Sequence, residues 1–182
     1  MSDESDAKSA PLAEQIERGA EQHGNSARDD QQAVAAATRE LLMARVGDRR
    51  YGFSVEGILS VLRPTNLTPV PHVPAYVSGV FNHQGRVMPL IDFAALIGAE
   101  SDRSSARWVV LGEGELEAAI AVDEVNGIET VELETIEPPP GGSEADRPFV
   151  EGQTPTHLGL VVIINVSKLL HHTQASEGRN HQ

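Results

Sequence analysis

The sequence predicts an all-β protein built from two copies of one structural unit. Short apolar runs rich in Val, Ile and Leu alternate with polar turns that contain glycine, which is the pattern of β-hairpins. The same order of hairpin, polar connection, second hairpin and short helix occurs over residues 41–98 and again over residues 108–171. No apolar run approaches the length that a membrane-spanning helix needs.

The repeat has two offsets. At an offset of 67 residues, Leu42, Gly47, Val55, Glu56, Ile58, Val61 and Thr68 match Val109, Gly114, Val122, Asp123, Val125, Ile128 and Thr135. At an offset of 73, Tyr76, Val77, Gly79, Val87, Ile91, Leu96 and Ile97 match Phe149, Val150, Gly152, Leu160, Ile164, Leu169 and Leu170, and Asp92 becomes Asn165. An insert around residues 138–148 absorbs the difference. Apolar matches are common among strands, so the glycines matched at turns carry the argument.

Residues 1–39 precede the first copy and are predicted to be a disordered acidic tail. They contain too few large apolar residues to build a core. Transient helices that dock a partner are an alternative, because Leu12 and Ile16 lie four residues apart and residues 31–40 favour helix. Residues 1–12 are acidic and lack an apolar run, so no secretory signal is expected.

The first copy opens with a hairpin, in which ELLMARV and YGFSV flank a turn at Gly47 and Asp48. Residues 58–62 are predicted to be a short amphipathic or irregular segment. Residues 64–74 contain four prolines, which predicts an extended connection into the next hairpin.

The second hairpin of this copy has strands at residues 77–81 and 87–91 around Asn82-His83-Gln84-Gly85. Gly85 fits the left-handed position of a type I turn with a bulge. Gly79 predicts a bulge or a close backbone approach, and Pro89 predicts that its strand runs along an edge there. Asp92 is expected to cap a short helix that ends at Gly98.

The second copy follows the same plan. A hairpin over residues 108–125 turns at Gly112-Glu113-Gly114-Glu115, and residues 127–131 form a candidate third strand. Residues 137–148 are predicted to be a surface loop. Residues 149–153 and 158–166 form the last hairpin, residues 167–172 form a closing helix, and residues 173–182 are predicted to be a disordered C-terminal tail.

Composition excludes several classes of function. The net charge is −13, with 14 Lys and Arg against 27 Asp and Glu, so no concentrated basic surface for nucleic acid is expected. Cysteine is absent, which excludes disulfides and thiolate metal sites. No glycine-rich loop precedes a helix in the way that a phosphate cofactor requires.

Enzyme chemistry has weak candidates. His171 and His172, with His157 or His83, could be imagined as metal ligands, but they lack any HxxxH or HExxH spacing. Asp92 could act as a general base, yet its place before a short helix favours capping, and Asn165 suits the same role in the second copy. Ser78 before Gly79 does not form a GxSxG elbow. We therefore predict no catalytic residue, no metal site, no cofactor and no enzymatic activity.

Several ordered motifs resemble one known family. They are GDRRYGFSV, TPVPHVPAYV, YVSGVFNHQGRVMPLIDFAALIG, AAIAVDEV, IETV and IEPPP, followed by the closing hairpin and helix. Together they are similar to the CheW-like coupling domains of bacterial chemosensory systems, over about residues 40–172. The resemblance implies two five-stranded SH3-like barrels side by side, with subdomains at about residues 41–105 and 106–171. The repeat leaves the strand partners open, including one strand of each copy that crosses to the other barrel.

The family resemblance implies a non-catalytic scaffold in the cytoplasm. Such an adaptor bridges the cytoplasmic tip of a methyl-accepting chemoreceptor and the regulatory domain of a chemotaxis histidine kinase, without direct membrane contact. By match to the family motif, the receptor-binding residues are Val55, Ile58, Ser60, Gly79, Asn82, Gln84, Gly85 and Val125. The kinase-binding residues are expected on the second barrel at Trp108, Leu116, Ala118, Ile120 and Val122.

The chain departs from the family pattern at polar positions. Family members commonly have Asn-Leu-Arg-Gly at the hairpin turn, so Gln84 replaces a guanidinium with a neutral amide. Ser54, Ser60 and Ala94 stand where aspartate, an acidic residue and arginine are frequent. We expect a divergent or auxiliary-system adaptor; the alternatives are a paralogue that binds the kinase but no receptor, and a generic SH3-like module, which would need clustered aromatic residues.

Overall fold

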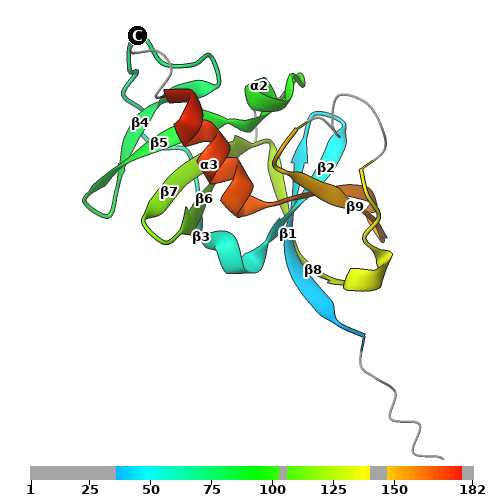
Figure 1. Ribbon diagram of the computed structural model, residues 1–182. Helices are drawn as coiled ribbons and strands as arrows, with labels where there is room; N and C mark the ends of the chain where they lie inside the picture. The colour runs from blue at the N-terminus through cyan, green and yellow to red at the C-terminus, as the bar shows by residue number, and fades with distance from the viewer. Residues whose placement is uncertain (1–35, 103–105, 140–146, 178–182) are drawn as a thin grey trace, which may run out of the picture. The chain divides into compact units, whose positions relative to one another are not determined.

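The computed structural model describes residues 36–102, 106–139 and 147–177, and these residues are mostly β-structure (Figure 1). The first copy contains β1 (Thr38–Val46), β2 (Arg49–Ser54), the 3₁₀ turn η1 (Val55–Gly57), β3 (Ile58–Leu62), β4 (Val77–His83), β5 (Arg86–Asp92) and α2 (Phe93–Ile97). The second contains β6 (Arg107–Glu113), β7 (Leu116–Val122), β8 (Glu124–Glu132), η3 (Leu133–Thr135), β9 (Val150–Thr156), β10 (Gly159–Ile164) and α3 (Val166–Glu177). The prediction of an all-β fold with short helices is confirmed.

The strands form two five-stranded sheets, each of which takes strands from both copies. Sheet A has the order β8-β1-β2-β10-β9, and sheet B has the order β3-β6-β7-β5-β4. Each sheet therefore combines the first hairpin of one copy with the last three strands of the other. The predicted boundary between residues 105 and 106 separates the copies but not the sheets. The last three strands of each copy therefore lie in a different sheet from its first hairpin. The parallel pairs β2–β10 and β5–β7 join the two copies within the sheets.

The register of the strands confirms the repeat. Ile58 pairs with Leu111, and the equivalent Val125 pairs with Ala44. Ile91 pairs with Ile120, and Ile164 pairs with Phe53 in the same way. The predicted match of Thr68 with Thr135 is wrong by two residues, because Thr68 bridges Val80 whereas Glu137 bridges the equivalent Gln153.

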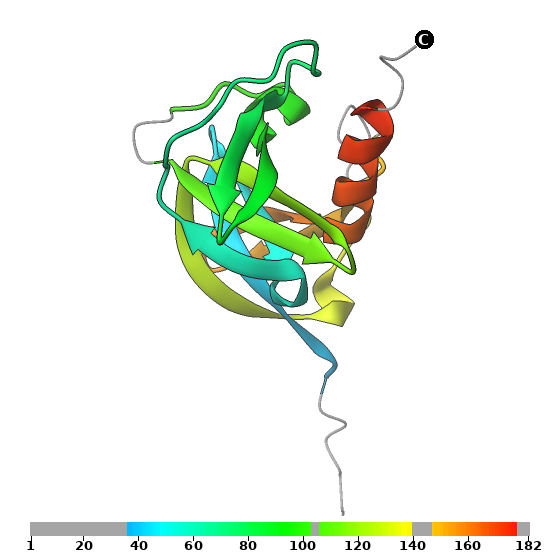
Figure 2. The same cartoon turned by 90° about the vertical axis from the view of Figure 1, so that its left-hand side faces the viewer.

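Three groups of buried apolar side chains hold the two sheets together. The inside of barrel B, which sheet B forms, contains Phe81, Met88, Leu90, Trp108, Val110 and Ala119. The inside of barrel A, which sheet A forms, contains Leu41, Met43, Val131, Val161 and Ile163. A larger shared core includes Phe53, Phe93, Ile120 and Phe149. Helix α3 contributes Leu169 and Leu170 to it and packs on β6 and β7, so a second-copy helix covers sheet B (Figure 2).

Most local predictions for the central hairpin are confirmed. The pairing of β4 with β5 shifts between Val77 and Gly79, which is the expected bulge, and a Cβ at Gly79 would lie 2.5 Å from the carbonyl oxygen of Thr68. Pairing of β5 with β7 starts only after Pro89. The turn type was predicted wrongly. Gln84 and Gly85 both have positive φ, 54° and 85°, which is typical of a two-residue type I′ turn.

Three boundary predictions were also wrong. Residues 58–62 are strand β3, because they pair with β6. The predicted N-terminal tail lies outside the described residues except for residues 36–39, of which Thr38 and Arg39 belong to β1. Helix α3 continues to Glu177. Thr173 is buried in it, and its hydroxyl donates a hydrogen bond to the carbonyl of Leu170 at 2.9 Å. The rest of the predicted C-terminal tail lies outside the described residues.

Candidate interaction surface

The outer strands of each sheet approach each other and close it into a barrel. In barrel B, the hydroxyl of Ser60 on β3 lies 3.5 Å from Nε2 of His83 on β4. In barrel A, Nδ1 of His157, in the β9–β10 turn, lies 3.0 Å from the Glu129 carboxylate on β8. The closing contacts are therefore polar, and both lie at the hairpin-turn end of their barrel.

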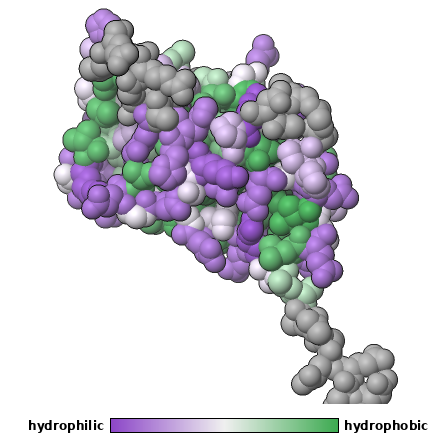
Figure 3. Space-filling view, viewed as in Figure 1, coloured by the Kyte–Doolittle hydropathy of each residue, from purple (hydrophilic) through white to green (hydrophobic). Residues whose placement is uncertain are grey.

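Each barrel exposes two large apolar residues whose repeat equivalents in the other barrel are also apolar and exposed; barrel B exposes Leu59 on β3 as well, at 55%, but its equivalent, Asn126, is polar. Val61 and Val87 are 42% and 73% exposed on barrel B, and Ile128 and Leu160 are 60% and 59% exposed on barrel A. We call Val61 and Val87 apolar pair B, and Ile128 and Leu160 apolar pair A. One member of each pair lies on the outer strand, and the other follows the hairpin turn. Patches of hydrophobic surface interrupt a mostly hydrophilic face in the view of Figure 3.

The β4–β5 turn beside apolar pair B is held by local polar contacts. The side-chain oxygen of Asn82 accepts a hydrogen bond from the backbone N–H of Gly85 at 2.9 Å. Arg86 pairs with Glu117 of β7 at 2.6 Å, which ties the end of the turn to a neighbouring strand. Gln84 remains exposed at the tip of this turn.

The residues considered for catalysis have structural partners. Asp92 accepts a hydrogen bond from the N–H of Ala95 at 3.1 Å, and Asn165 accepts one from the N–H of Lys168 at 2.9 Å, so both cap helices as expected. His83 and His157 make contacts in different barrels. Among the described residues no cluster of three or more His, Asp or Glu could hold a metal ion. No helix in the described part of the chain is long and apolar enough to cross a membrane.

Comparison with known proteins decides the family. A family model described as the CheW-like domain matches residues 40–174. This chain belongs to the CheW-like family. It is 34% identical to protein FrzA of Myxococcus xanthus over 142 residues, 76% of this chain and 89% of FrzA. It is 35% identical to the chemotaxis protein CheW of Rhizobium meliloti over 117 residues, 63% of this chain and 76% of that protein.

A solved structure shares the fold. The scaffolding protein TtCheW from Thermoanaerobacter tengcongensis superimposes with a TM-score of 0.65 at 25% identity, over 70% of this chain and 89% of that one. The CheW-like identification and its two-barrel architecture are therefore confirmed. The strand exchange described above is how this CheW-like chain builds its barrels.

The structure brings together part of the predicted receptor-binding set. Ser60 lies beside His83, which adjoins Asn82, Gln84 and Gly85, so one surface of barrel B carries four of the predicted residues. Val55 and Ile58 are half-buried, and Ile58 packs against the shared core. Gly79 is buried against the Thr68 carbonyl. Val125 lies in sheet A, paired with Ala44.

Four of the five predicted kinase-binding residues are buried in the structure. Trp108, Ala118, Ile120 and Val122 are 5%, 5%, 1% and 2% exposed, and only Leu116 of the five is half-buried. Strand β7 lies between β6 and β5, and its buried side chains enter either the shared core, as Ala118, Ile120 and Val122 do, or the inside of barrel B, as Ala119 does. Four of the five therefore contribute to the buried interior, and a role for this set in kinase binding stays a prediction.

The polar departures from the CheW-like pattern have different surroundings. Gln84 is exposed, and Ser54 and Ser60 are half-buried. Ala94 is 3% exposed and packs in the shared core, so an arginine there would have to displace that packing. The apolar pairs were missed by sequence reasoning, although the repeat already matched Val61 with Ile128 and Val87 with Leu160. What the sequence lacked was their exposure.

Proposed function

We propose that this protein is a non-catalytic adaptor that couples chemoreceptors to a chemotaxis-type histidine kinase in a bacterial chemosensory array. An adaptor needs two separate docking surfaces on a rigid body. The observation that supports the proposal best is that each barrel of this CheW-like chain exposes an equivalent apolar pair beside its hairpin turn. We expect the protein to work in the cytoplasm, at the membrane-associated array, through protein contacts alone.

The receptor tip is proposed to dock on barrel B. This surface combines apolar pair B with Ser60, Asn82, Gln84 and Gly85, and the turn is held by the Asn82 contact to Gly85. A helix that packs here would bury Val87, which is 73% exposed. Burying a valine side chain contributes about 1.5 kcal/mol or more. The contact would therefore be mainly apolar, with neutral polar groups around it.

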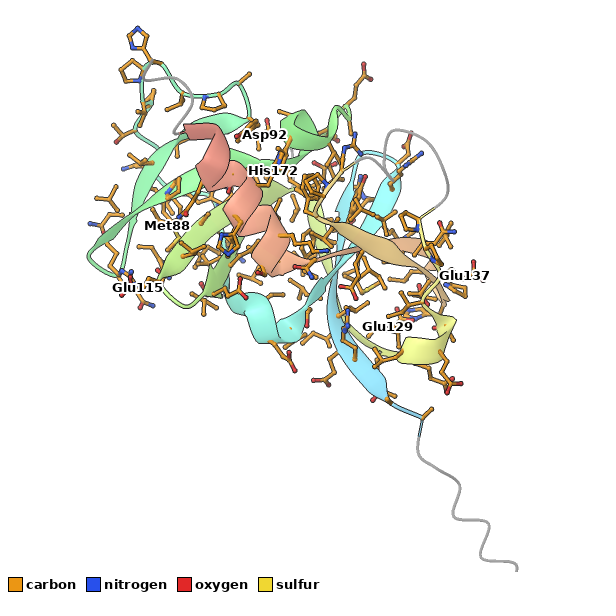
Figure 4. The ribbon with its side chains drawn as sticks, in the orientation of Figure 1. Met88, Asp92, Glu115, Glu129, Glu137 and His172 are labelled. Atoms are coloured by element: carbon orange, nitrogen blue, oxygen red, sulfur yellow. The ribbon has the colours of Figure 1, made fainter. Side chains whose placement is uncertain are left out.

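The kinase regulatory domain is proposed to dock on barrel A. Ile128 and Leu160 are both more than half exposed there, in place of the buried residues that sequence reasoning assigned to the kinase. His157 and Glu129 lie beside this surface and supply polar groups at its rim. Figure 4 shows Glu129 and Glu137 on the barrel A side of the molecule and Met88 on the barrel B side.

An auxiliary chemosensory system is the proposed setting. The similarity to FrzA of Myxococcus xanthus is consistent with it. Gln84 carries no charge, and the nearby Arg86 is paired with Glu117, so this turn offers less free positive charge than the usual family motif. A cognate receptor would then present a neutral or apolar surface in place of carboxylates.

The test is titration calorimetry of the full chain against the kinase regulatory domain and a receptor-tip fragment from the same organism. We expect micromolar or tighter binding to both. Val87→Glu should weaken receptor binding at least tenfold and leave kinase binding unchanged, and Leu160→Glu should do the reverse. Val70→Glu is the matched control, because Val70 is also exposed but lies outside both surfaces. Binding of neither partner by the unmodified chain would overturn the adaptor function.

Two alternatives make different predictions. A paralogue that has lost receptor coupling would bind the kinase fragment alone, and Gln84→Arg would strengthen receptor binding severalfold. A generic SH3-like peptide module needs exposed aromatic residues. The seven aromatic residues of this chain are all buried or half-buried, which favours the adaptor over that module.

A further inference from the structure

A cavity of about 250 Å³ lies at the end of barrel B that is opposite the β4–β5 turn. Trp108, Leu67 and Leu90 supply its apolar lining, and Ser78 and Ala106 stand among its small residues. Its volume is below that of sites for drug-sized ligands, which start near roughly 300 Å³. The cavity therefore suits a single extended side chain.

The two barrels differ at this place in an informative way. The residues of barrel A that are equivalent to Ala106 and Ser78 are Arg39 and Glu151, by the offsets of 67 and 73 residues. Arg39 and Glu151 form an ion pair at 2.7 Å. Ser78 and Glu151 each occupy the bulge of their hairpin, so the equivalence holds in the register as well. Barrel B thus has two small residues where barrel A has a guanidinium and its carboxylate.

Among the described residues, the charged groups that line the cavity are negative. Its two carboxyl groups, Asp92 and Asp123, are 6% and 1% exposed. The Arg45 guanidinium lies 3.6 Å from Asp123. Trp108 adds an indole ring, the aromatic group that attracts cations most strongly. Carboxylates and an indole in one cavity form a suitable environment for a guanidinium, which is planar and stacks on aromatic faces.

We propose that this cavity binds an arginine side chain that a docking protein presents. The arginine would enter beside Ala106 and Ser78 and take the position that Arg39 takes in barrel A. Its guanidinium would lie near Trp108, within the field of Asp92 and Asp123. This site shares no lining residue with either apolar pair.

The site has a built-in reporter, because Trp108 is the single tryptophan of the chain. The full chain is titrated at low salt with N-acetyl-arginine amide, and tryptophan emission is recorded. N-acetyl-citrulline amide is the matched control, since citrulline has the same shape without the charge. We expect a saturable change with the arginine compound and at least tenfold weaker binding of the citrulline compound. Equal responses to the two compounds, or a linear response to arginine, would overturn the proposal.

Two variants locate the response. Ala106→Arg combined with Ser78→Glu rebuilds the ion pair of barrel A and should abolish arginine binding while the thermal unfolding midpoint is kept. Ser78→Leu fills the cavity without adding charge and should also abolish arginine binding. This variant provides the test if the double variant does not fold. Leu133→Ser, on the surface of barrel A, is the control that should bind as the unmodified chain does. Unchanged binding by Ser78→Leu would refute the assignment.

A final arm tests whether the arginine comes from a protein. A blocked Gly-Gly-Arg-Gly-Gly peptide should bind at least as tightly as the blocked amino acid, because a docking protein supplies main chain on both sides. Tenfold weaker binding of the peptide would limit the cavity to free guanidinium compounds and overturn docking. None of these measurements uses a kinase or receptor, so their outcome is independent of the adaptor proposal.

Discussion

Asp123→Ala should cost more stability than any other single removal of a charged side chain in the described part of the protein. Asp123 is 1% exposed, directly after β7. Its carboxylate accepts hydrogen bonds from the N–H of Gly47, at 2.8 Å, and from the hydroxyl of Ser101, and it lies 3.6 Å from the Arg45 guanidinium. One side chain therefore joins the β1–β2 turn, the segment after α2 and the end of β7.

The magnitude follows from these contacts. A hydrogen bond to a buried charged group contributes about 1.5–3 kcal/mol, and the two donors would be left without their acceptor. The Arg45 contact adds little, because Arg45 is one-third exposed and such pairs contribute about 0–1 kcal/mol. We therefore expect a loss of about 3–5 kcal/mol in the free energy of unfolding, and about half of that for Asp123→Asn, which keeps one acceptor oxygen.

Urea unfolding followed by Trp108 fluorescence measures this loss. The control is Glu56→Ala, because Glu56 is the repeat equivalent of Asp123 and is exposed. Surface changes of this kind usually stay within about 0.5 kcal/mol. If Asp123→Ala and Glu56→Ala have the same small effect, the carboxylate does not join these segments and the reasoning is refuted.

Four further substitutions and one division of the chain have expected outcomes. Gly79→Ala should lower the free energy of unfolding by about 2 kcal/mol or more, since its Cβ would meet the Thr68 carbonyl at 2.5 Å, while Gly85→Ala meets no neighbour and should cost only the left-handed penalty of about 1 kcal/mol. Gln84→Gly should raise stability by a few tenths to about 1 kcal/mol, because φ of 54° strains a side-chain residue. Asp92→Ala should cost about 1 kcal/mol through loss of the α2 cap. Urea midpoints check all of these. Fragments cut at residue 105 should each lack native far-UV circular dichroism, because each sheet needs both copies.

The sequence predicted the repeat because turns and bulges require glycine at particular positions. Gly47 and Gly114 have the same φ of 59°, and Gly79 and Gly152 both lie against a crossing backbone, so those glycines recur at a fixed offset. The pairing of one strand with another requires no particular residue type. A parallel pair such as β5 with β7 joins segments with ordinary apolar residues, and nothing in Ile91 or Ile120 indicates which of the equivalent strands it meets.

The residues of the candidate site also differ in whether local sequence predicts their exposure. Asn82, Gln84 and Gly85 could be placed on a surface from sequence, because turn residues between strands are exposed. The burial of Ala118 and Ile120 could not be predicted, because an apolar run of this kind suits a buried central strand as well as an exposed one. Exposure of Val87 or Leu160 depends on packing from the other copy, which local pattern does not contain.

The exchange of strands has a mechanical consequence for an adaptor. If each barrel were built from one copy, a single connection would join the two surfaces, and their relative orientation could vary. Here the parallel pairs β2–β10 and β5–β7 join the copies within both sheets, and the shared core contains side chains of β1, β5, β7, β10, α2 and α3. Any rotation of apolar pair A relative to apolar pair B must break strand pairing or open this core. A receptor helix and a kinase domain docked on the two pairs would therefore be held at a fixed angle.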